Sequence, residues 1–291
     1  MNLVIAATPA VAIPTIKHLQ LSHQVTLVTQ PDRPSGRGKK LRESEVSQVF
    51  PEALKPENET ELRNILADRD LLITIGYGRL LSEEILQVPK FGGINLHFSL
   101  LPRWRGAAPV QRAIAAGDKT SGVTVFQMDK GMDTGPIWSQ KSFEIPYGHN
   151  SQQLFDDLAA IGVTAVDEAL IAITSGADPI AQSGTASIAK KISKDECLIN
   201  WSNDAESIVR QIKAFSFNPG VLAVIRGQNI KILDARISNA ILAAGEINSN
   251  GEVGTGSGSI QLLEVTPAGK RTMNVSDWLN GFKLQEGEKF E

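Results

Sequence analysis

Three polar residues within one segment, Gly92 to Pro136, have the chemistry needed to transfer an acyl group to an amine. They are an amide, an imidazole and a carboxylate: Asn95, His97 and Asp133. Amide and imidazole groups can donate hydrogen bonds to a developing oxyanion, and an imidazole beside a carboxylate can move the proton of an attacking amine. We therefore expect these three side chains to be catalytic.

The amide and the imidazole lie in a run with the alternation of a β-strand. Ile94, Leu96 and Phe98 are apolar and alternate with polar residues, so Asn95 and His97 would point to one face. A lone histidine in a strand is more often a structural residue. A half-buried strand seldom gives two inward positions to polar groups without a use, because each unsatisfied buried group costs about 1–3 kcal/mol.

Two loops follow β-rich runs in this segment. Residues 99–102 end the first run at a proline, and the basic, aromatic stretch 103–106 comes next. A second run, 122–128, leads into the glycine-flanked acidic loop 129–135, which holds Asp133. An Asp between glycines is most often a turn former. In parallel α/β sheets, however, loops at the carboxyl ends of strands bind ligands, so a functional site is expected here.

The sequence of these two runs resembles a known family. INLHFSLLPRWRGAAPVQRAI followed by GVTVFQMDKGMDTG is similar to the signature of the 10-formyltetrahydrofolate-dependent formyltransferases. TQPDRPSGRGKKL resembles the basic insertion loop of the branch that acts on methionyl-tRNA. KKISKDECLINW and LLEVTPAGKRTMNVSDWLNG resemble the interdomain linker and terminal segment of that branch. The resemblance covers nearly the whole chain.

The resemblance implies a reaction and roles for particular residues. The formyl group of 10-formyltetrahydrofolate would go to the α-amino group of methionine on initiator tRNA. Asn95 and His97 would donate hydrogen bonds to the oxyanion, and Asp133 would pair with the imidazole and help to move the amine proton. A wall of the folate site would be formed by Ser99, Leu100, Leu101 and Pro102.

Four residues depart from the pattern of the family. Ala7 stands where the first loop usually has glycine, and Val11 stands where an aromatic residue is common. Phe98 replaces a residue that is normally small, and Pro136 stands where an acid is usual. The proposed catalytic residues are unaffected by these departures.

The order of the apolar runs predicts an α/β fold with a second, β-rich domain. Strand-like runs at residues 2–7, 24–29, 71–76 and 93–98 alternate with helix-like stretches, which is typical of a Rossmann-like domain with a parallel-rich sheet. Helices are expected over 14–19, 59–66, 109–116 and about 151–174. Short β runs at 221–225, 230–233 and 260–265 predict a small barrel, and the resemblance implies an OB-like domain.

We expect three functional parts along the chain. They are a formyltransferase catalytic domain over residues 1–180, a linker over 181–200 and an OB-like tRNA-binding domain over 201–291.

The charge is distributed unevenly along the chain. Its formal net charge of -3 does not suit a general nucleic-acid binder. Five cations nevertheless lie between residues 33 and 42, in a stretch without hydrophobic period, and the linker is also basic. A basic run is more often plain solvated surface, but two basic elements on separate domains suit a large RNA. The residues expected to bind tRNA are Arg33, Arg37, Lys39, Lys40, Arg42, Lys190 and Lys191.

The remaining composition bears on compartment and partners. A single cysteine, Cys197, excludes an intrachain disulfide and fits a reducing cytoplasm. No run approaches the ~20 uninterrupted apolar residues of a membrane helix, so no membrane partner is expected. The candidate site lacks His, Cys and Asp residues at ligand spacing, so we expect no metal. Nothing in the sequence indicates an obligate dimer, and a monomer is expected.

Two alternatives share parts of this pattern. An enzyme that formylates a nucleotide sugar or glycinamide ribonucleotide would have the same core but would not need the basic loop at 33–42. A non-catalytic RNA-binding module would have no need for the amide, imidazole and carboxylate together.

Overall fold

The computed structural model describes residues 1–35, 40–216, 218–285 and 287–291, and the chain falls into two compact units. Unit 1 comprises Met1–Gly106, Thr120–Glu144 and Phe155–Ile188. Unit 2 comprises Ala107–Lys119, Ile145–Leu154 and Ala189–Glu291.

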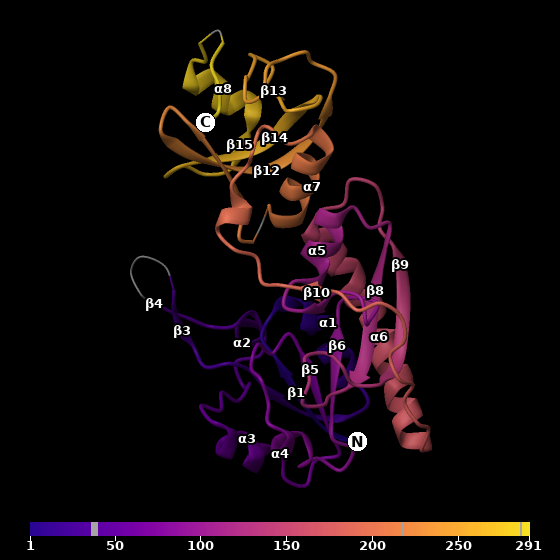
Figure 1. Ribbon diagram of the computed structural model, residues 1–291. Helices are drawn as coiled ribbons and strands as arrows, with labels where there is room; N and C mark the ends of the chain where they lie inside the picture. The colour runs from indigo at the N-terminus through magenta and orange to yellow at the C-terminus, as the bar shows by residue number, and fades with distance from the viewer. Residues whose placement is uncertain (36–39, 217, 286) are drawn as a thin grey trace. The chain divides into compact units, whose positions relative to one another are not determined.

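Unit 1 is built on a six-stranded sheet. Its strands are β1 (Asn2–Ala7), β2 (Gln24–Val28), β5 (Leu71–Ile75), β6 (Gly93–His97), β8 (Thr120–Gln127) and β9 (Ile137–Glu144). They lie in the order β2-β1-β5-β6-β8-β9 (Figure 1). The first four run parallel to one another, and β8 and β9 are antiparallel to their neighbours. The predicted parallel-rich α/β sheet is confirmed.

Helices lie between these strands in the chain or follow the last of them. They are α1 (Ile13–Leu19), α2 (Glu45–Val49), α3 (Glu59–Leu66), α4 (Glu83–Leu86) and α6 (Ser151–Ser175), with a 3₁₀ turn at Ala10–Ala12. Helix α3 begins where predicted because Asn58 caps it: the Asn58 side chain accepts a hydrogen bond from the amide of Glu61 at 3.0 Å. The short helices α2 and α4 were not predicted, since few residues carry their period.

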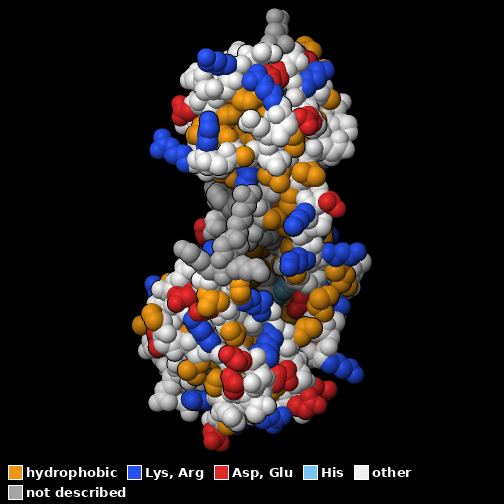
Figure 2. All heavy atoms as spheres, turned by 90° about the vertical axis from the view of Figure 1, so that its left-hand side faces the viewer, with side chains coloured by type: hydrophobic (Ala, Val, Ile, Leu, Met, Phe, Trp, Pro, Cys, Tyr) orange, Lys and Arg blue, Asp and Glu red, His pale blue; other side chains and the backbone are white. Residues whose placement is uncertain are grey.

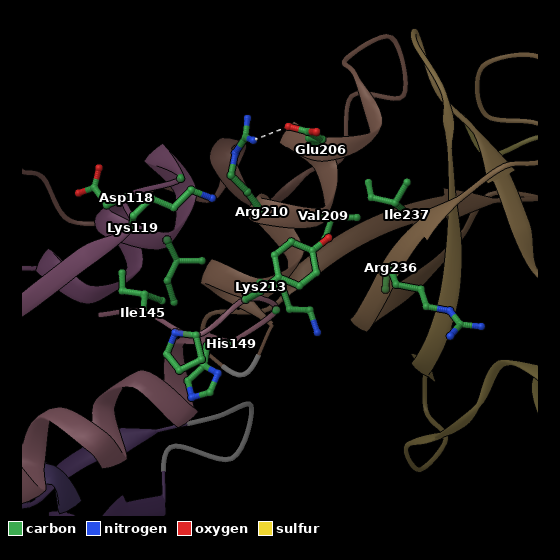
Figure 3. A pocket seen from close by; sticks show the side chains of 16 residues that line it. Asp118, Lys119, Ile145, His149, Glu206, Val209, Arg210, Lys213, Arg236 and Ile237 are labelled. Carbon is green, nitrogen blue, oxygen red and sulfur yellow. Dashed lines mark hydrogen bonds and ion pairs between the residues drawn. The ribbon is translucent and has the colours of Figure 1, made fainter. Parts of the chain in front are cut away.

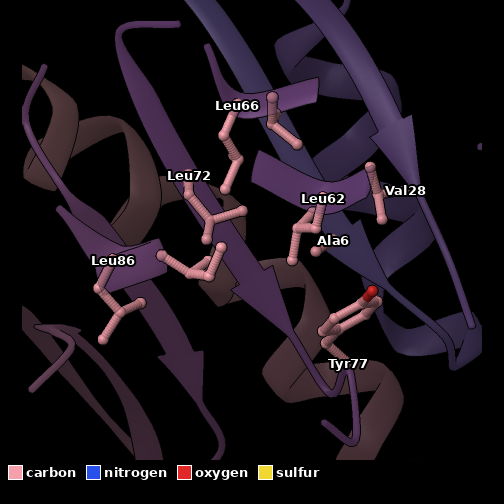
Figure 4. Close-up of a cluster of buried hydrophobic side chains, with 9 residues drawn as sticks. Ala6, Val28, Leu62, Leu66, Leu72, Tyr77 and Leu86 are labelled. Carbon is pink, nitrogen blue, oxygen red and sulfur yellow. The ribbon is translucent and has the colours of Figure 1, made fainter. Parts of the chain in front are cut away.

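A hydrophobic cluster fixes α3 and α4 in the core of unit 1. Leu62 and Leu66 of α3 are fully buried with Val4 of β1 and Leu72 of β5 (Figure 4). Leu86 of α4 belongs to the same cluster. This packing holds neighbouring strands in one register and so fixes where their carboxyl ends lie.

Helix α6 is the one helix among the described residues that is long and apolar enough to cross a membrane by length and composition. Its most apolar window has a mean hydropathy of 1.6, and 44% of that window is buried inside the protein. Gly162 lets the helix approach β6 closely, because an added Cβ would lie 3.0 Å from the side chain of Leu96. Asp167 and Glu168, in the same helix, bond His18 and Ser139 of unit 1.

Unit 2 contains a curled antiparallel sheet. Its strands are β11 (Val221–Ile225), β12 (Gln228–Ser238), β13 (Glu252–Gly254), β14 (Ser259–Pro267) and β15 (Met273–Asn274). The order is β11-β12-β14-β13, and β15 pairs with β14. The predicted β-rich second domain is confirmed. The helices of the unit are α5 (Pro109–Ala116), α7 (Ala205–Phe215) and α8 (Val275–Phe282), with a 3₁₀ turn at Asp195–Cys197.

Helix α7 was not predicted, although its pattern is present in the sequence. Asp204 caps the helix, accepting a hydrogen bond from the amide of Ser207 at 2.8 Å. Ile208, Ile212 and Phe215 are buried and have the i, i+4, i+7 spacing of a helix face.

Two further pairs of short strands involve segments of functional interest. These strands are β3 (Arg33–Ser35), β4 (Lys40–Arg42), β7 (Arg105–Gly106) and β10 (Ile188–Ala189). The basic segment at 33–42 was expected to be irregular, and this expectation was wrong at its two ends. β3 and β4 form an antiparallel ladder in which Arg33 lies opposite Arg42. Like charges directly opposite each other destabilise a strand pair. The concentration of positive charge here therefore lowers the stability of the β3–β4 pair.

The cluster around α3 generates a stability prediction. Leu62→Ala should lower the free energy of unfolding by about 2–5 kcal/mol, because the lost side chain leaves a cavity in a packed interior. Leu21→Ala is the matched control, since Leu21 is 85% exposed. Urea denaturation of both variants checks the prediction, and equal losses would contradict the assignment of the core.

Candidate active site

Strand β6 and the loop between β8 and β9 bring the three predicted catalytic residues to one place in unit 1. Asn95 and His97 are two positions apart on β6 and therefore share a face. The Nδ1 atom of His97 lies 3.6 Å from Oδ2 of Asp133. The imidazole and the carboxylate thus face each other, as the sequence predicted.

His97 is buried and held by the backbone. Its side chain is 8% exposed, and Nε2 lies 2.9 Å from the carbonyl oxygen of Trp104. A carbonyl only accepts, so Nε2 carries a proton, and in the neutral ring Nδ1 is the acceptor facing Asp133. Burial lowers the pKa of His97 below its ordinary value, against the opposing effects of Asp133 and of the Trp104 bond.

Asp133 is oriented by a backbone amide. The amide of Gly106 donates a hydrogen bond of 2.7 Å to Oδ2 of Asp133, the same oxygen that faces the imidazole. The backbone of Asp133 has a φ of 56°, in the left-handed region that non-glycine residues rarely adopt. Trp104, whose carbonyl holds the imidazole, has a φ of 62°. Two strained backbone positions therefore meet at this pair, as is common at functional sites.

Glycines shape the loop that carries Asp133. A Cβ added to Gly135 would lie 1.7 Å from the carbonyl oxygen of Gln127, so only glycine fits. A Cβ at Gly131 would lie 2.0 Å from Oγ1 of Thr134. The side chain of Asp129 accepts hydrogen bonds from the Gly131 amide and the Thr134 hydroxyl, at 2.9 and 2.7 Å. This closed loop places Asp133 at a fixed position.

Asn95 is held by a threonine of the neighbouring strand. Its Nδ2 atom donates to Oγ1 of Thr74 at 2.7 Å. An amide carries two donor hydrogens, so this bond leaves one for another acceptor. The Thr74 hydroxyl also lies 3.3 Å from the sulfur of Met128, just before the acidic loop.

A cavity of about 490 Å³ lies within unit 1 and is lined by Met128, whereas Asn95, His97 and Asp133 are not among its lining residues. Leu86, Met128 and Asp129 are among its lining residues. Its wall is thus partly apolar and partly backbone and charged groups, as in many sites for small organic ligands.

The predicted folate wall, residues 99–102, is largely interior. Ser99 and Leu101 are buried, with 1% and 4% of their surface exposed. The Ser99 hydroxyl donates to the carbonyl of Arg103 at 2.6 Å, and the Thr124 hydroxyl donates to the carbonyl of Ser99 at 2.6 Å. Pro102 is also buried, and Leu100 is half-buried. These contacts give residues 99–102 a packing role beneath the loop whose Trp104 carbonyl bonds His97.

The predicted tRNA-binding residues that the structure describes lie on the surface. Arg33 and Arg42 are exposed on the β3–β4 hairpin, and Arg33 donates to Oε1 of Gln30 at 3.0 Å. Lys190 and Lys191 are exposed, and their carbonyls accept from the Arg112 side chain. Lys and Arg side chains are spread across the face drawn in Figure 2. Two other predicted tRNA-binding residues, Arg37 and Lys39, lie outside the described residues. The side chain of Lys40 is also not described.

A second cavity, of about 290 Å³, lies in unit 2, away from the predicted site residues (Figure 3). Its lining includes Lys119, His149 and Arg210, and Arg210 pairs with Glu206 at 3.4 Å. Lys213 also lines it and pairs with Asp234 at 2.5 Å.

The described part of the chain contains no group of three His, Cys, Asp or Glu residues that could hold a metal ion. Cys197 is buried, and its thiol donates to the carbonyl of Ser193 at 3.3 Å. Burial raises the pKa of this thiol, so it is not primed as a nucleophile.

Comparisons with known proteins match both parts of the chain. A family model described as "Formyl transferase" matches residues 3–170, and one described as "Formyl transferase, C-terminal domain" matches 191–283. The chain is 37% identical over 302 residues to the methionyl-tRNA formyltransferase of Methylococcus capsulatus, with 98% of each chain covered. It is 38% identical over 289 residues to that of Dictyoglomus thermophilum, with 92% of each covered.

The chain belongs to the methionyl-tRNA formyltransferase family. The resemblance predicted from the sequence motifs is confirmed, and the chain is a formyltransferase rather than a non-catalytic RNA-binding module. A solved structure of HypX from Aquifex aeolicus in complex with tetrahydrofolic acid has the same fold, with a TM-score of 0.72 and 16% identity. That match covers 97% of this chain, which spans about half the length of HypX (47%).

Sequence reasoning missed the residues of this formyltransferase that hold Asn95, His97 and Asp133. Thr74, Trp104 and Gly106 were not singled out, because two of them act through backbone groups that any residue carries. Thr74 could have been found, since it is a polar residue in the otherwise apolar run of β5.

The depressed pKa of His97 generates a prediction for the formyltransferase's stability. The unfolded chain, with an ordinary histidine pKa of about 6.5, binds the proton more readily than the folded protein. The neutral ring of His97 therefore makes its full contribution to the free energy of unfolding above about pH 6.5. This contribution is lost as the pH falls below that value. As the pH is lowered from about 7.5 to 5.5, the free energy of unfolding should fall less for His97→Asn than for the wild type. Urea denaturation at each pH measures this fall.

The same comparison controls for the other titrating groups. His23, whose pKa is also lowered by burial, is present in both proteins, so the difference between the two curves isolates His97. Parallel curves would contradict the assignment of a neutral, buried imidazole.

Proposed function

We propose that this protein transfers the formyl group of 10-formyltetrahydrofolate to the α-amino group of methionyl initiator tRNA, in the cytoplasm and as a monomer. The observation that carries the proposal is that Nδ1 of His97 lies 3.6 Å from the carboxylate of Asp133, with Asn95 on the same strand as His97. The relationship to methionyl-tRNA formyltransferases over the whole chain supports the choice of substrate.

The first step is attack of the amine on the formyl carbon. A bond forms between the amino nitrogen and that carbon, and the carbonyl electrons move to oxygen to give a tetrahedral oxyanion. Asn95 would donate its second amide hydrogen to this oxygen. Donors placed in advance at the position of developing charge stabilise it without reorganisation.

The second step needs a proton carrier. The Nε2 proton of His97 is donated to the carbonyl of Trp104. The ring can therefore exchange a proton with the reacting groups only through Nδ1. We propose that Nδ1 and Asp133 together take up the amine proton, directly or through water. The ring is then a cation that donates to the oxyanion, and the proton passes to the folate nitrogen as its bond to the formyl carbon breaks.

The contacts of Asn95 connect it, through Thr74 and Met128, to a cavity that could hold the folate. The cavity lined by Leu86, Met128 and Asp129 adjoins Met128, which contacts the same Thr74 hydroxyl that holds the Asn95 amide. We propose that the folate ring system binds in this cavity. Residues Ser99, Leu100, Leu101 and Pro102 would support the end of the folate site next to His97, from the protein interior.

The tRNA would contact two basic elements. One is the hairpin of β3 and β4, with Arg33 and Arg42 in register, together with the neighbouring residues Arg37, Lys39 and Lys40. The other is the linker at residues 181–200, with Lys190 and Lys191, followed by the domain at 201–291 as a tRNA-binding domain. Exposed cations on a polar segment suit the phosphate backbone.

A substrate comparison tests the function directly. Purified protein and 10-formyltetrahydrofolate are incubated with charged initiator tRNA, charged elongator tRNA or free methionine, and N-formyl product is measured. Initiator methionyl-tRNA should be formylated much faster than the other two. Preference for a small amine, such as an amino sugar nucleotide, would overturn the proposal.

The catalytic roles can be separated by substitution. Asn95→Ala should lower kcat by about 10²–10³, because one oxyanion donor is lost. Asp133→Asn should be nearly inactive, since an amide side chain cannot take up a proton near neutral pH. Lys17→Ala, an exposed residue of α1, is the control for general effects and should have wild-type turnover. Wild-type kcat in Asp133→Asn would contradict the role of the carboxylate.

The basic hairpin should govern the salt dependence of tRNA binding. The tRNA affinity should fall steeply as salt rises, since phosphate contacts release counterions. Arg33→Ala with Arg42→Ala should weaken binding and reduce the slope of log K against log salt by about 1–2. Filter binding at several salt concentrations measures this. An unchanged slope, equal to that of Lys17→Ala, would show that the hairpin does not contact phosphates.

A further inference from the structure

Residues 180–188, which we term the strap, lie against the catalytic loops within unit 1. At one end Ile180 exchanges two backbone hydrogen bonds with Ile137, at 2.7 and 2.8 Å. Near the other end, the amide of Ser187 donates to the carbonyl of Pro102, and the carbonyl of Ser187 accepts from the amide of Arg105. The strap thus joins the chain after the Asp133 loop to the chain after the His97 strand.

One side chain of the strap, Gln182, uses its whole amide at the site. Its Nε2 atom donates to the carbonyls of Asp133 and Gly135, at 2.9 and 2.8 Å. Its Oε1 atom accepts from Nε and Nη2 of Arg105, at 3.2 and 2.6 Å. Two donor hydrogens and two lone pairs are all that a glutamine amide offers, so its hydrogen-bonding capacity is full. Guanidinium groups only donate and carbonyls only accept, which fixes the orientation of the amide.

The partners of Gln182 determine the position of the catalytic carboxylate. Asp133 is in the left-handed backbone region, and its carbonyl is one of the two that Gln182 holds. Arg105 immediately precedes Gly106, whose amide bonds the Asp133 carboxylate at 2.7 Å. Gln182 therefore holds both the backbone of Asp133 and the residue next to the donor that orients its side chain.

We propose that Gln182 is a positioning residue for the formyl transfer: its amide locks Asp133 against Gly106 and in front of His97. This inference rests on the proposed function for its kinetic consequence. A displacement of about 1 Å at a reacting group can cost 10²-fold in rate, so loss of the clamp should lower kcat rather than raise KM.

Gln182→Glu is the informative variant, because it has nearly the same shape and keeps the acceptor for Arg105. It places an oxygen against the carbonyls of Asp133 and Gly135, where a donor is required. Gln182→Met removes all four bonds at similar volume. Both variants should lose kcat by about 10- to 100-fold, with KM for initiator methionyl-tRNA and for 10-formyltetrahydrofolate within about threefold of wild type. Ser183→Ala, at the exposed neighbouring position, should leave both constants unchanged.

The amide signal of Gly106 gives a readout independent of activity. A charge-assisted hydrogen bond to a carboxylate moves an amide resonance, so the ¹H–¹⁵N signal of Gly106 reports where Asp133 lies. It should shift in Gln182→Glu and Gln182→Met and stay in place in Ser183→Ala.

The outcomes separate this inference from the proposed function. An unmoved Gly106 signal, or kcat within about twofold of wild type in both Gln182 variants, would overturn the positioning role. A loss of activity that only follows the fraction of unfolded protein would also overturn it. If the wild type forms no formyl-methionyl-tRNA, the proposed function fails, and the Gly106 signal alone then decides whether Gln182 positions Asp133.

Discussion

The contact between a buried imidazole and one carboxylate is the constraint on which the rest of the site depends. His97 is almost removed from water, which disfavours its charged form, while the carboxylate of Asp133 favours that form. The ring nitrogen away from the carboxylate is tied to the carbonyl of Trp104. Only Nδ1 can therefore change its protonation within the site, and it does so next to an oxygen that a backbone amide already holds.

Holding this pair in place explains several features of unit 1. Strand β6 supplies the imidazole from the centre of a packed sheet, whereas Asp133 comes from a loop, which is intrinsically less well fixed. The loop is therefore restrained by its glycines, by Asp129 and by the amide of Gln182. The position of Asp133 therefore depends on hydrogen bonds to backbone groups as much as on packing.

The sequence predicted those parts of the fold that carry strong local patterns. The apolar alternation around Asn95 and His97 predicted β6, and the helix-like spacing over residues 59–66 predicted α3. The parallel-rich sheet followed from the alternation of strands and helices. Helix α7 was not predicted, although its buried residues Ile208, Ile212 and Phe215 recur at helical spacing.

The candidate site could be predicted from its side chains, but the groups that hold these side chains could not. Asn95, His97 and Asp133 are unusual residue types for their positions, and their types alone indicate a site. Trp104 and Gly106 contribute a carbonyl and an amide, which every such residue possesses, and only coordinates place them. Gln182 is 49 residues from the loop it holds, and a single polar residue in an irregular segment has no distinguishing pattern.

The glycine at position 135 has a consequence for how relatives of this protein are recognised. It is required because the Gln127 carbonyl leaves no room for a methyl group, which is a demand of the loop and not of the reaction. A duplicated copy that had lost its imidazole would still need this glycine in order to fold. A motif search that weights the glycines heavily would therefore find this loop whether or not the imidazole beside it is present.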